Sequence, residues 1–171
     1  MSVTADLKCS LTIDETVAFV SSQVLEGKFT AALSYVAGAA AVSNGVNVSW
    51  TKAGAAAVTL ASAATVTYTL TALTDALGRS ATFAGGVRGL WIRVTSRTAG
   101  DYLTVGAAGT NPWTSMFGGT TPTIKVFKFL CVAADLTDEY AVTASSNEQL
   151  KITNSGSNSI TFEIGLIGCS S

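Results

Sequence analysis

Apolar and polar residues alternate with a period of two through most of this chain, and the period of an amphipathic helix is almost absent. Successive residues of a strand lie on opposite faces of a sheet, so each alternating segment predicts a strand with one apolar and one polar face. Seven segments carry this pattern: Leu7–Ile13, Phe29–Tyr35, Val46–Trp50, Val66–Leu70, Leu90–Val94, Leu150–Ile152 and Ile160–Leu166.

Short turns rich in Gly and Asn separate these segments, as strands joined by tight connections require. The cluster Asn154–Asn158 predicts a hairpin between Gln149–Asn154 and Ser159–Ile167. Residues Gly85–Gly89 predict a tight turn into the strand that follows. Many short strands at this spacing predict an all-β fold, a single antiparallel β-sandwich or jelly-roll-like domain covering residues 1–171.

Three segments depart from that simple pattern. Thr71–Leu77 and Pro112–Phe117 are each long enough for a short helical turn. The segment Met1–Asp14 alternates and is lightly charged, so two interpretations stay open. It pairs with a strand of its own sheet, or it is an N-terminal arm exchanged with a neighbouring copy.

The composition points to assembly. Hydrophobic residues make up 48% of the chain and charged residues only 12%, and the mean hydropathy is +0.43. The longest apolar stretches, near Val36–Val42 and Ala53–Ala64, are too short to cross a bilayer. With a net charge of -1, repulsion between copies is weak. We therefore expect a homo-oligomer, such as a trimer.

The charge pattern and the N-terminal residues limit which binding partners and which cellular compartment are expected. No run of basic residues marks a nucleic-acid footprint or a polybasic segment for a membrane surface. Met1–Asp6 has no positive start followed by an apolar block, so no signal peptide is expected. The distant Cys9, Cys131 and Cys169 suit small buried hydrophobes better than a disulfide framework.

Few residues suggest a catalytic or metal-binding role. The chain contains no histidine, which removes the commonest general base and the commonest metal ligand. Asp135, Asp138 and Glu139 form the one close acidic cluster, but their spacing differs from that of a calcium loop, so a solvated turn is the favoured interpretation. We expect no enzyme activity, no cofactor and no metal site.

Three tryptophans provide the alternative of carbohydrate binding. Trp50, Trp91 and Trp113 could stack on sugar rings, although tryptophans of β domains are more often core or interface residues. Trp113 lies on an irregular segment, so we expect it to be exposed or at a subunit contact. The candidate interface residues are Leu7, Leu11, Trp113 and Phe117.

The last three fifths of the chain, roughly, carry a resemblance. The motifs are Leu70–Gly78, then Gly89-Leu90-Trp91-Ile92, Leu103-Thr104-Val105-Gly106, Asn111-Pro112-Trp113, Tyr140-Ala141-Val142-Thr143 and Gln149–Asn154. Together they resemble small β-sandwich proteins encoded among the virion genes of tailed bacteriophages. The resemblance implies a particle component and supplies no catalytic residues.

The functional expectation follows from this resemblance and from the composition. The chain is expected to be a capsid decoration (cement) protein, made in the host cytoplasm and residing in the virion. It would bind the major capsid protein of a phage shell and stabilise the head as a homo-oligomer. The alternative is a receptor- or glycan-binding component of a head fibre or tail.

Overall fold

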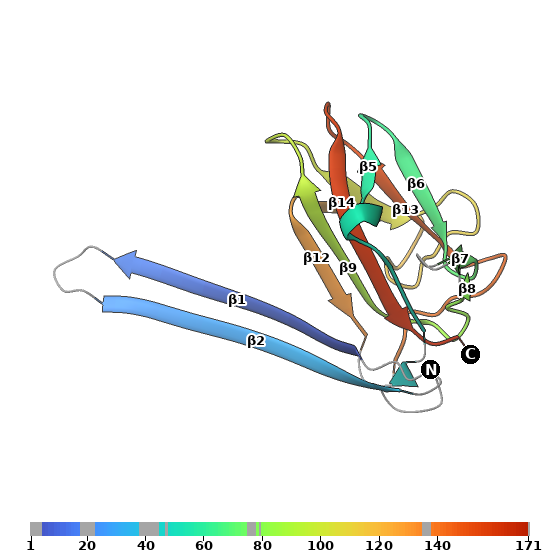
Figure 1. Cartoon of the computed structure of the whole chain (residues 1–171), viewed down its shortest axis with the longest axis horizontal. Helices are drawn as coiled ribbons and strands as arrows, with labels where there is room; N and C mark the ends of the chain where they lie inside the picture. The colour runs from blue at the N-terminus through green and yellow to red at the C-terminus, as the bar shows by residue number, and fades with distance from the viewer. Residues whose placement is uncertain are drawn as a thin grey trace.

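The protein is an all-β structure, which confirms the fold class predicted from the sequence. The computed structural model describes residues 5–17, 23–37, 45–46, 48–74, 78, 80–134 and 138–170, and before residue 48 it describes the backbone alone. Strands make up 52% of the chain, and antiparallel sheets pack against each other as in a β-sandwich. Figure 1 shows the two layers and a long hairpin extending from them.

The described strands follow one another closely in sequence. They are β1 (Ala5–Val17), β2 (Gln23–Ala37), β3 (Gly45–Val46), β4 (Val48–Lys52), β5 (Val58–Leu60), β6 (Thr65–Thr69), β7 (Leu73–Thr74), β8 (Ser80–Ala81), β9 (Val87–Ser96), β10 (Leu103–Ala107), β11 (Thr123–Val126), β12 (Phe129–Ala133), β13 (Gln149–Asn154) and β14 (Ile160–Gly168), with a 3-10 turn η1 (Gly54–Ala56).

Two sheets form the sandwich. One has the strand order β12-β9-β14-β4, with β5 also paired to β14, and the other has the order β11-β10-β13-β6. All of these pairings are antiparallel. Each of the seven alternating segments overlaps one or two of the described strands, although Leu70 follows β6 and Asn47 lies outside the described part. Within the described part of the chain, no helix is both long and apolar enough to cross a membrane.

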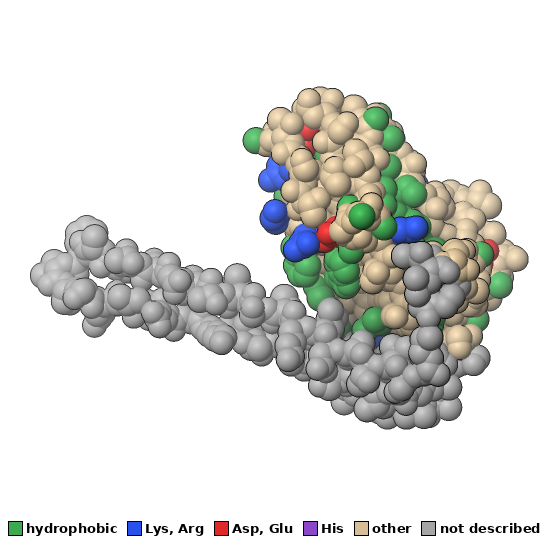
Figure 2. Space-filling model, viewed as in Figure 1, with side chains coloured by type: hydrophobic (Ala, Val, Ile, Leu, Met, Phe, Trp, Pro, Cys, Tyr) green, Lys and Arg blue, Asp and Glu red, His purple; other side chains and the backbone are tan. Residues whose placement is uncertain are grey.

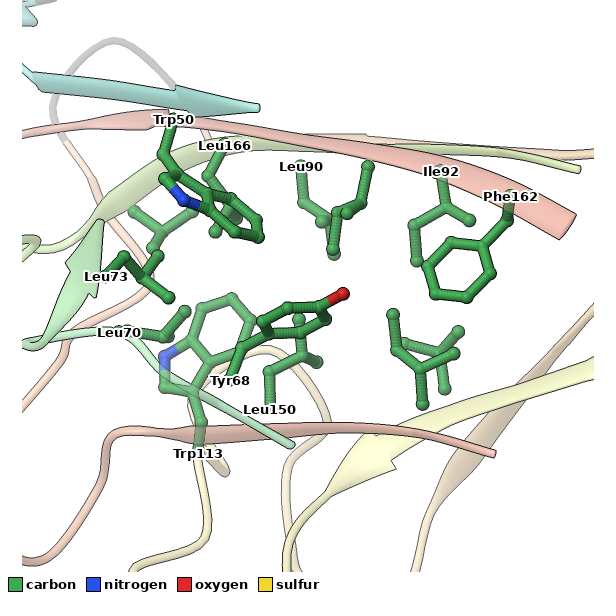
Figure 3. Close-up of a cluster of buried hydrophobic side chains, with 14 of the residues drawn as sticks. Trp50, Tyr68, Leu70, Leu73, Leu90, Ile92, Trp113, Leu150, Phe162 and Leu166 are labelled. Carbon is green, nitrogen blue, oxygen red and sulfur yellow. The ribbon is translucent and has the colours of Figure 1, made fainter. Parts of the chain in front are cut away.

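The core lies between the two sheets and consists of the apolar faces that the alternation predicts. In β9, Leu90, Ile92 and Val94 are buried while Arg93 is exposed. Figure 3 shows side chains from both layers meeting in this space, among them Trp50 and Leu150. Packing of these two apolar layers is the main stabilising contribution, because burial removes their surfaces from water.

Tyr68 of β6 is an exception inside this core. Its ring makes an edge-on contact with the Trp50 ring, with the ring centroids 5.1 Å apart. Its buried hydroxyl has no hydrogen-bond partner among the described residues, and burial raises the pKa of Tyr68 to about 12. An unsatisfied buried hydroxyl typically costs about 1–3 kcal/mol, so the ring's packing must offset this penalty.

The predicted hairpin between Gln149–Asn154 and Ser159–Ile167 is wrong. β13 and β14 belong to different sheets, so their connection is an arch that crosses the sandwich. Asn154 explains the crossing: its fully buried side chain donates hydrogen bonds to the carbonyls of Leu60, Ala61 and Asn158 at 2.8–3.0 Å. These bonds hold the chain at a corner where a hairpin would have continued a single sheet.

Glycine is required inside the arch. A Cβ atom on Gly156 would overlap the side chain of Asp101. The close approach lets the Asp101 carboxylate accept hydrogen bonds from the N–H groups of Ser157 and Asn158, at 3.0 and 3.2 Å. The Gly and Asn residues interpreted as a hairpin turn therefore serve an inter-sheet connection.

The N-terminal strands form a separate sheet with the order β1-β2-β3. β1 has 13 residues and pairs in antiparallel register with β2 over its whole length, with Leu7 opposite Leu33 and Leu11 opposite Phe29. Figure 1 shows this hairpin running away from the sandwich. Residues 5–14 thus pair within their own chain, and exchange of the segment Met1–Asp14 with a neighbouring copy stays a prediction.

The two expected helical turns have different outcomes. In Pro112–Phe117 a single turn is present, because the N–H groups of Phe117 and Gly118 both donate to the carbonyl of Thr114, at 2.9 and 2.8 Å. In Thr71–Leu77 the described residues include β7, which pairs with β8. A helical turn there is wrong for β7, because two consecutive residues pair in a ladder, and residues 75–77 lie outside the described part.

Candidate functional site

Within the described residues, no three His, Cys, Asp or Glu side chains lie close enough to hold a metal ion. Of the acidic cluster, Asp138 and Glu139 are exposed, and Asp135 lies outside the described part. Glu139 forms an ion pair with the buried Arg88 at 3.5 Å. This arrangement ties the segment before Tyr140 to the start of β9.

Three other carboxylates, of Asp101, Glu148 and Glu163, are nearly buried in the sandwich. The pKa of Asp101 is lowered, first by the hydrogen bond from the Asn158 side chain and then by the Ser157 N–H. Asp101 therefore stabilises the β13–β14 arch as a charged acceptor. A carboxylate committed to backbone donors is poorly placed to exchange a proton with a substrate.

Glu148 is the centre of a polar network at one end of the sandwich. Its carboxylate accepts hydrogen bonds from the Thr71 hydroxyl, from the Ser145 N–H at 2.9 Å and from the Asn111 side chain at 3.3 Å. The pKa of Glu148 is lowered, with the Thr71 bond as the largest cause. Ser145 and Asn111 have φ angles of 63° and 44°. The network thus holds two loop residues in the left-handed region, where non-glycine residues are uncommon.

Glu163 lies on the outer face of β14. It accepts a hydrogen bond from the Gly54 N–H at 3.0 Å and pairs with Arg93 at 2.6 Å. The pKa of Glu163 is lowered, first by the Gly54 N–H and then by Arg93. The pair fixes η1 to the sheet.

These three carboxylates predict how stability depends on pH. Because the pKa of each is lower in the folded than in the unfolded chain, their stabilisation is present above the unfolded values of about 4. It is lost as the pH falls through the folded values. We expect the urea midpoint to be constant from about pH 6 to 8 and to fall below about pH 4. An Asp101→Asn variant should show a smaller fall, and an unchanged acid profile would contradict this assignment.

The expectation that Trp113 is exposed is wrong. Its side chain is 0% exposed, and its indole N–H donates to the Ala141 carbonyl at 3.0 Å. Phe117 and Tyr140 meet its ring edge-on, with centroids 6.1 and 6.2 Å away. An irregular backbone segment can still fill a core, because its single turn directs the indole inward. Trp50 is also buried, so neither tryptophan can stack on a sugar.

The other candidate interface residues differ in how far the structure describes them. Phe117 is half-buried and packs against the core beside Trp113. Leu7 and Leu11 have described backbone positions in β1, opposite Leu33 and Phe29, and their side chains lie outside the described part. The structure therefore brings Phe117 next to Trp113 and places the two leucines on a separate sheet.

A cluster of cationic and aromatic side chains lies at one end of the sandwich. The sequence patterns above did not predict it. The Arg97 guanidinium lies 5.6 Å from the Phe127 ring centre, and the Lys125 ammonium lies 4.9 Å from the Tyr102 ring centre. The two rings are themselves 5.3 Å apart. Such cation–ring contacts are individually weak at an exposed site, but they fix the cations in place.

A hollow of about 440 Å³ opens beside this cluster, in the size range of small-ligand sites. Two cations line it, Arg97 and Lys128, and the remaining lining is small or hydroxylated: Val94, Thr95, Ser96 and Ala99. Figure 2 shows Lys and Arg side chains gathered on the flank of the sandwich formed by β9 and β12. We call Arg97, Lys125 and Lys128, with this hollow, the basic end.

Two large apolar side chains are exposed next to the basic end. Phe127 and Phe129 are 46% and 52% exposed, on either side of Lys128. The segment Lys125–Phe129 has lysines at its first and fourth positions and apolar residues at the other three. This mixture of basic and apolar residues was the available signal for the surface, but a search for consecutive basic residues does not detect it. Exposed aromatic rings beside cations are typical of interaction surfaces.

The chain was compared with known families, with curated proteins and with solved structures, and none of them matches it.

Proposed function

We propose that this chain is a structural virion protein, most specifically a capsid decoration protein that binds a phage shell as a homo-oligomer. The observation that carries the proposal is the β1–β2 hairpin. Its 13-residue strand β1 lies in a sheet that shares no strand with the sandwich. At about 3.3 Å per residue, such a strand reaches about 40 Å, far enough to bridge neighbouring subunits of a shell.

The β1–β2 hairpin has an apolar face that a partner surface would cover. Directly paired residues of an antiparallel ladder lie on the same face, so the register places Leu7 and Leu11 on one face with Leu33 and Phe29. The opposite face carries polar positions such as Thr12. A two-stranded sheet is marginally stable in water, and covering its apolar face would stabilise it.

The low charge of the chain supports the same conclusion. Only 12% of its residues are charged, about half the usual share of a soluble domain. Weak repulsion between copies favours dense arrays, and many modest contacts on a symmetric particle add up to strong retention. The resemblance of the C-terminal motifs to phage β-sandwich proteins is consistent with this role.

Binding to particles tests the proposal. Particles of the virus that encodes the chain, stripped of it, should bind the purified chain in co-sedimentation and then resist heat better. A Leu7→Asp/Leu11→Asp variant should bind at least about tenfold more weakly, because charge on the apolar face opposes burial. Ser10→Asp/Thr12→Asp, on the polar face of the same strand, is the matched control and should bind normally. Absence of the chain from native particles would contradict the proposal.

A further inference from the structure

The cations of the basic end outnumber the acidic groups described beside them. Arg97, Lys125 and Lys128 form no ion pair within the part of the chain that the structure describes. The Asp101 carboxylate interacts electrostatically with Arg97, and it keeps its negative charge while it accepts hydrogen bonds from Ser157 and Asn158. In a chain with so few charges, three cations against this one carboxylate leave a net positive charge at the basic end.

The far end of the hairpin has the opposite charge. The register places Asp14 directly opposite Glu26, and Glu15 follows in β1. Like charges at directly paired positions destabilise a ladder. The nearest cation in the hairpin is Lys28, which lies opposite Thr12. A cationic surface outside the hairpin would attract both carboxylates and offset their mutual repulsion.

From these two observations we propose that the hairpin end of one copy, carrying Asp14, Glu15 and Glu26, docks on the basic end of a second copy. The inference rests on the proposed homo-oligomer and names its contact. Asp14 and Glu26 share one face of the hairpin end, and docking brings that face against the hollow lined by Arg97 and Lys128. The exposed Phe127 and Phe129 beside it supply apolar area at the same contact.

The occupant is a second copy because the hairpin cannot reach its own basic end while it remains extended. Figure 1 shows the end of the hairpin, where β1 stops and β2 starts, pointing away from the sandwich. The contact joins two different surfaces, so it repeats head to tail and gives either a closed ring or an open chain of copies. A closed trimer is one such ring.

Charged pairs at a contact rim govern association rate and salt dependence. Association should therefore weaken when salt rises from about 0.1 M to about 1 M, where the screening length falls from about 10 Å to about 3 Å. Carboxylates and Lys or Arg side chains keep their charges near neutrality. The contact should change little between about pH 6 and 8.

Charge reversal tests the contact, with the native mass in solution as the readout. An Asp14→Lys/Glu26→Lys chain and an Arg97→Glu/Lys128→Glu chain should each associate at least about tenfold more weakly than the unmodified chain. A chain carrying all four reversals should associate again, since both sides of the contact are then exchanged. Lys151→Glu, a cation on β13 in the other sheet, is the control and should associate normally. If Arg97→Glu disturbs folding, Lys128→Glu alone keeps the test valid.

The outcomes separate this inference from the proposed function. Unchanged association of the reversed chains, or failure of the four-fold reversal to restore it, would overturn the docking contact. A chain that is monomeric at every concentration and still binds particles would also overturn it, while the structural role would survive. Recovery of an acidic glycan on the basic end, lost in the Arg97→Glu/Lys128→Glu chain, would assign the hollow to that ligand instead.

Discussion

Replacement of Trp113 by Ala is expected to lower the free energy of unfolding by about 3–5 kcal/mol, the cost typical of removing a large aromatic side chain from a core. The indole is fully buried, and its loss would leave a cavity beside Phe117 and Tyr140. It would also leave the Ala141 carbonyl without its indole donor. Urea unfolding of the two chains, followed by circular dichroism, measures this difference.

The control for Trp113 is an aromatic residue on the surface. Phe129 is 52% exposed, so Phe129→Ala should change the free energy of unfolding by no more than about 0.5–1 kcal/mol. Equal effects of the two substitutions would contradict the burial of Trp113. A soluble, stable Trp113→Ala chain that had lost only its association would restore the original expectation of an interface tryptophan.

The second large effect is expected at Asn154, where substitution by Ala should cost about 3 kcal/mol or more. The side-chain amide satisfies three backbone carbonyls, and its own oxygen accepts the Gly156 N–H at 2.9 Å. Alanine leaves these groups buried without their partner. Because the arch joins the two sheets, the loss should appear as a single cooperative shift of the unfolding transition.

Asn158→Ala is the matched control for Asn154→Ala. The Asn158 side chain is exposed and donates to one oxygen of Asp101 at 3.1 Å, so its removal should cost about 1 kcal/mol. If Asn154→Ala costs no more than this control, water or other donors replace the amide, and the arch does not depend on Asn154.

Much of the fold could be predicted from the sequence, because period-two alternation is local. Positions such as Leu90, Ile92 and Leu150 are buried as their alternation indicates. Pairing between sheets is not local. The sequence around Asn154–Asn158 contains good turn residues, and it does not show that Asn154 would reach carbonyls more than 90 positions away.

The candidate surface was harder to predict for a similar reason. Arg97 and Lys128 are 31 positions apart, and they line one hollow only because β9 and β12 pair, with Arg93 opposite Phe129. Trp113 was misplaced because an irregular segment was equated with exposure. Its burial depends on Phe117 and Tyr140, which follow it in the chain by 4 and 27 positions.

The central claim is that this chain works as part of a larger assembly. The decisive measurement is sedimentation velocity of the intact chain, at low and high concentration and in mixture with particles of the virus proposed to encode it. We expect a species heavier than the 17.4 kDa monomer at high concentration, and recovery of the chain in the particle fraction. A monomer of 17.4 kDa at every concentration that never sediments with particles would contradict it.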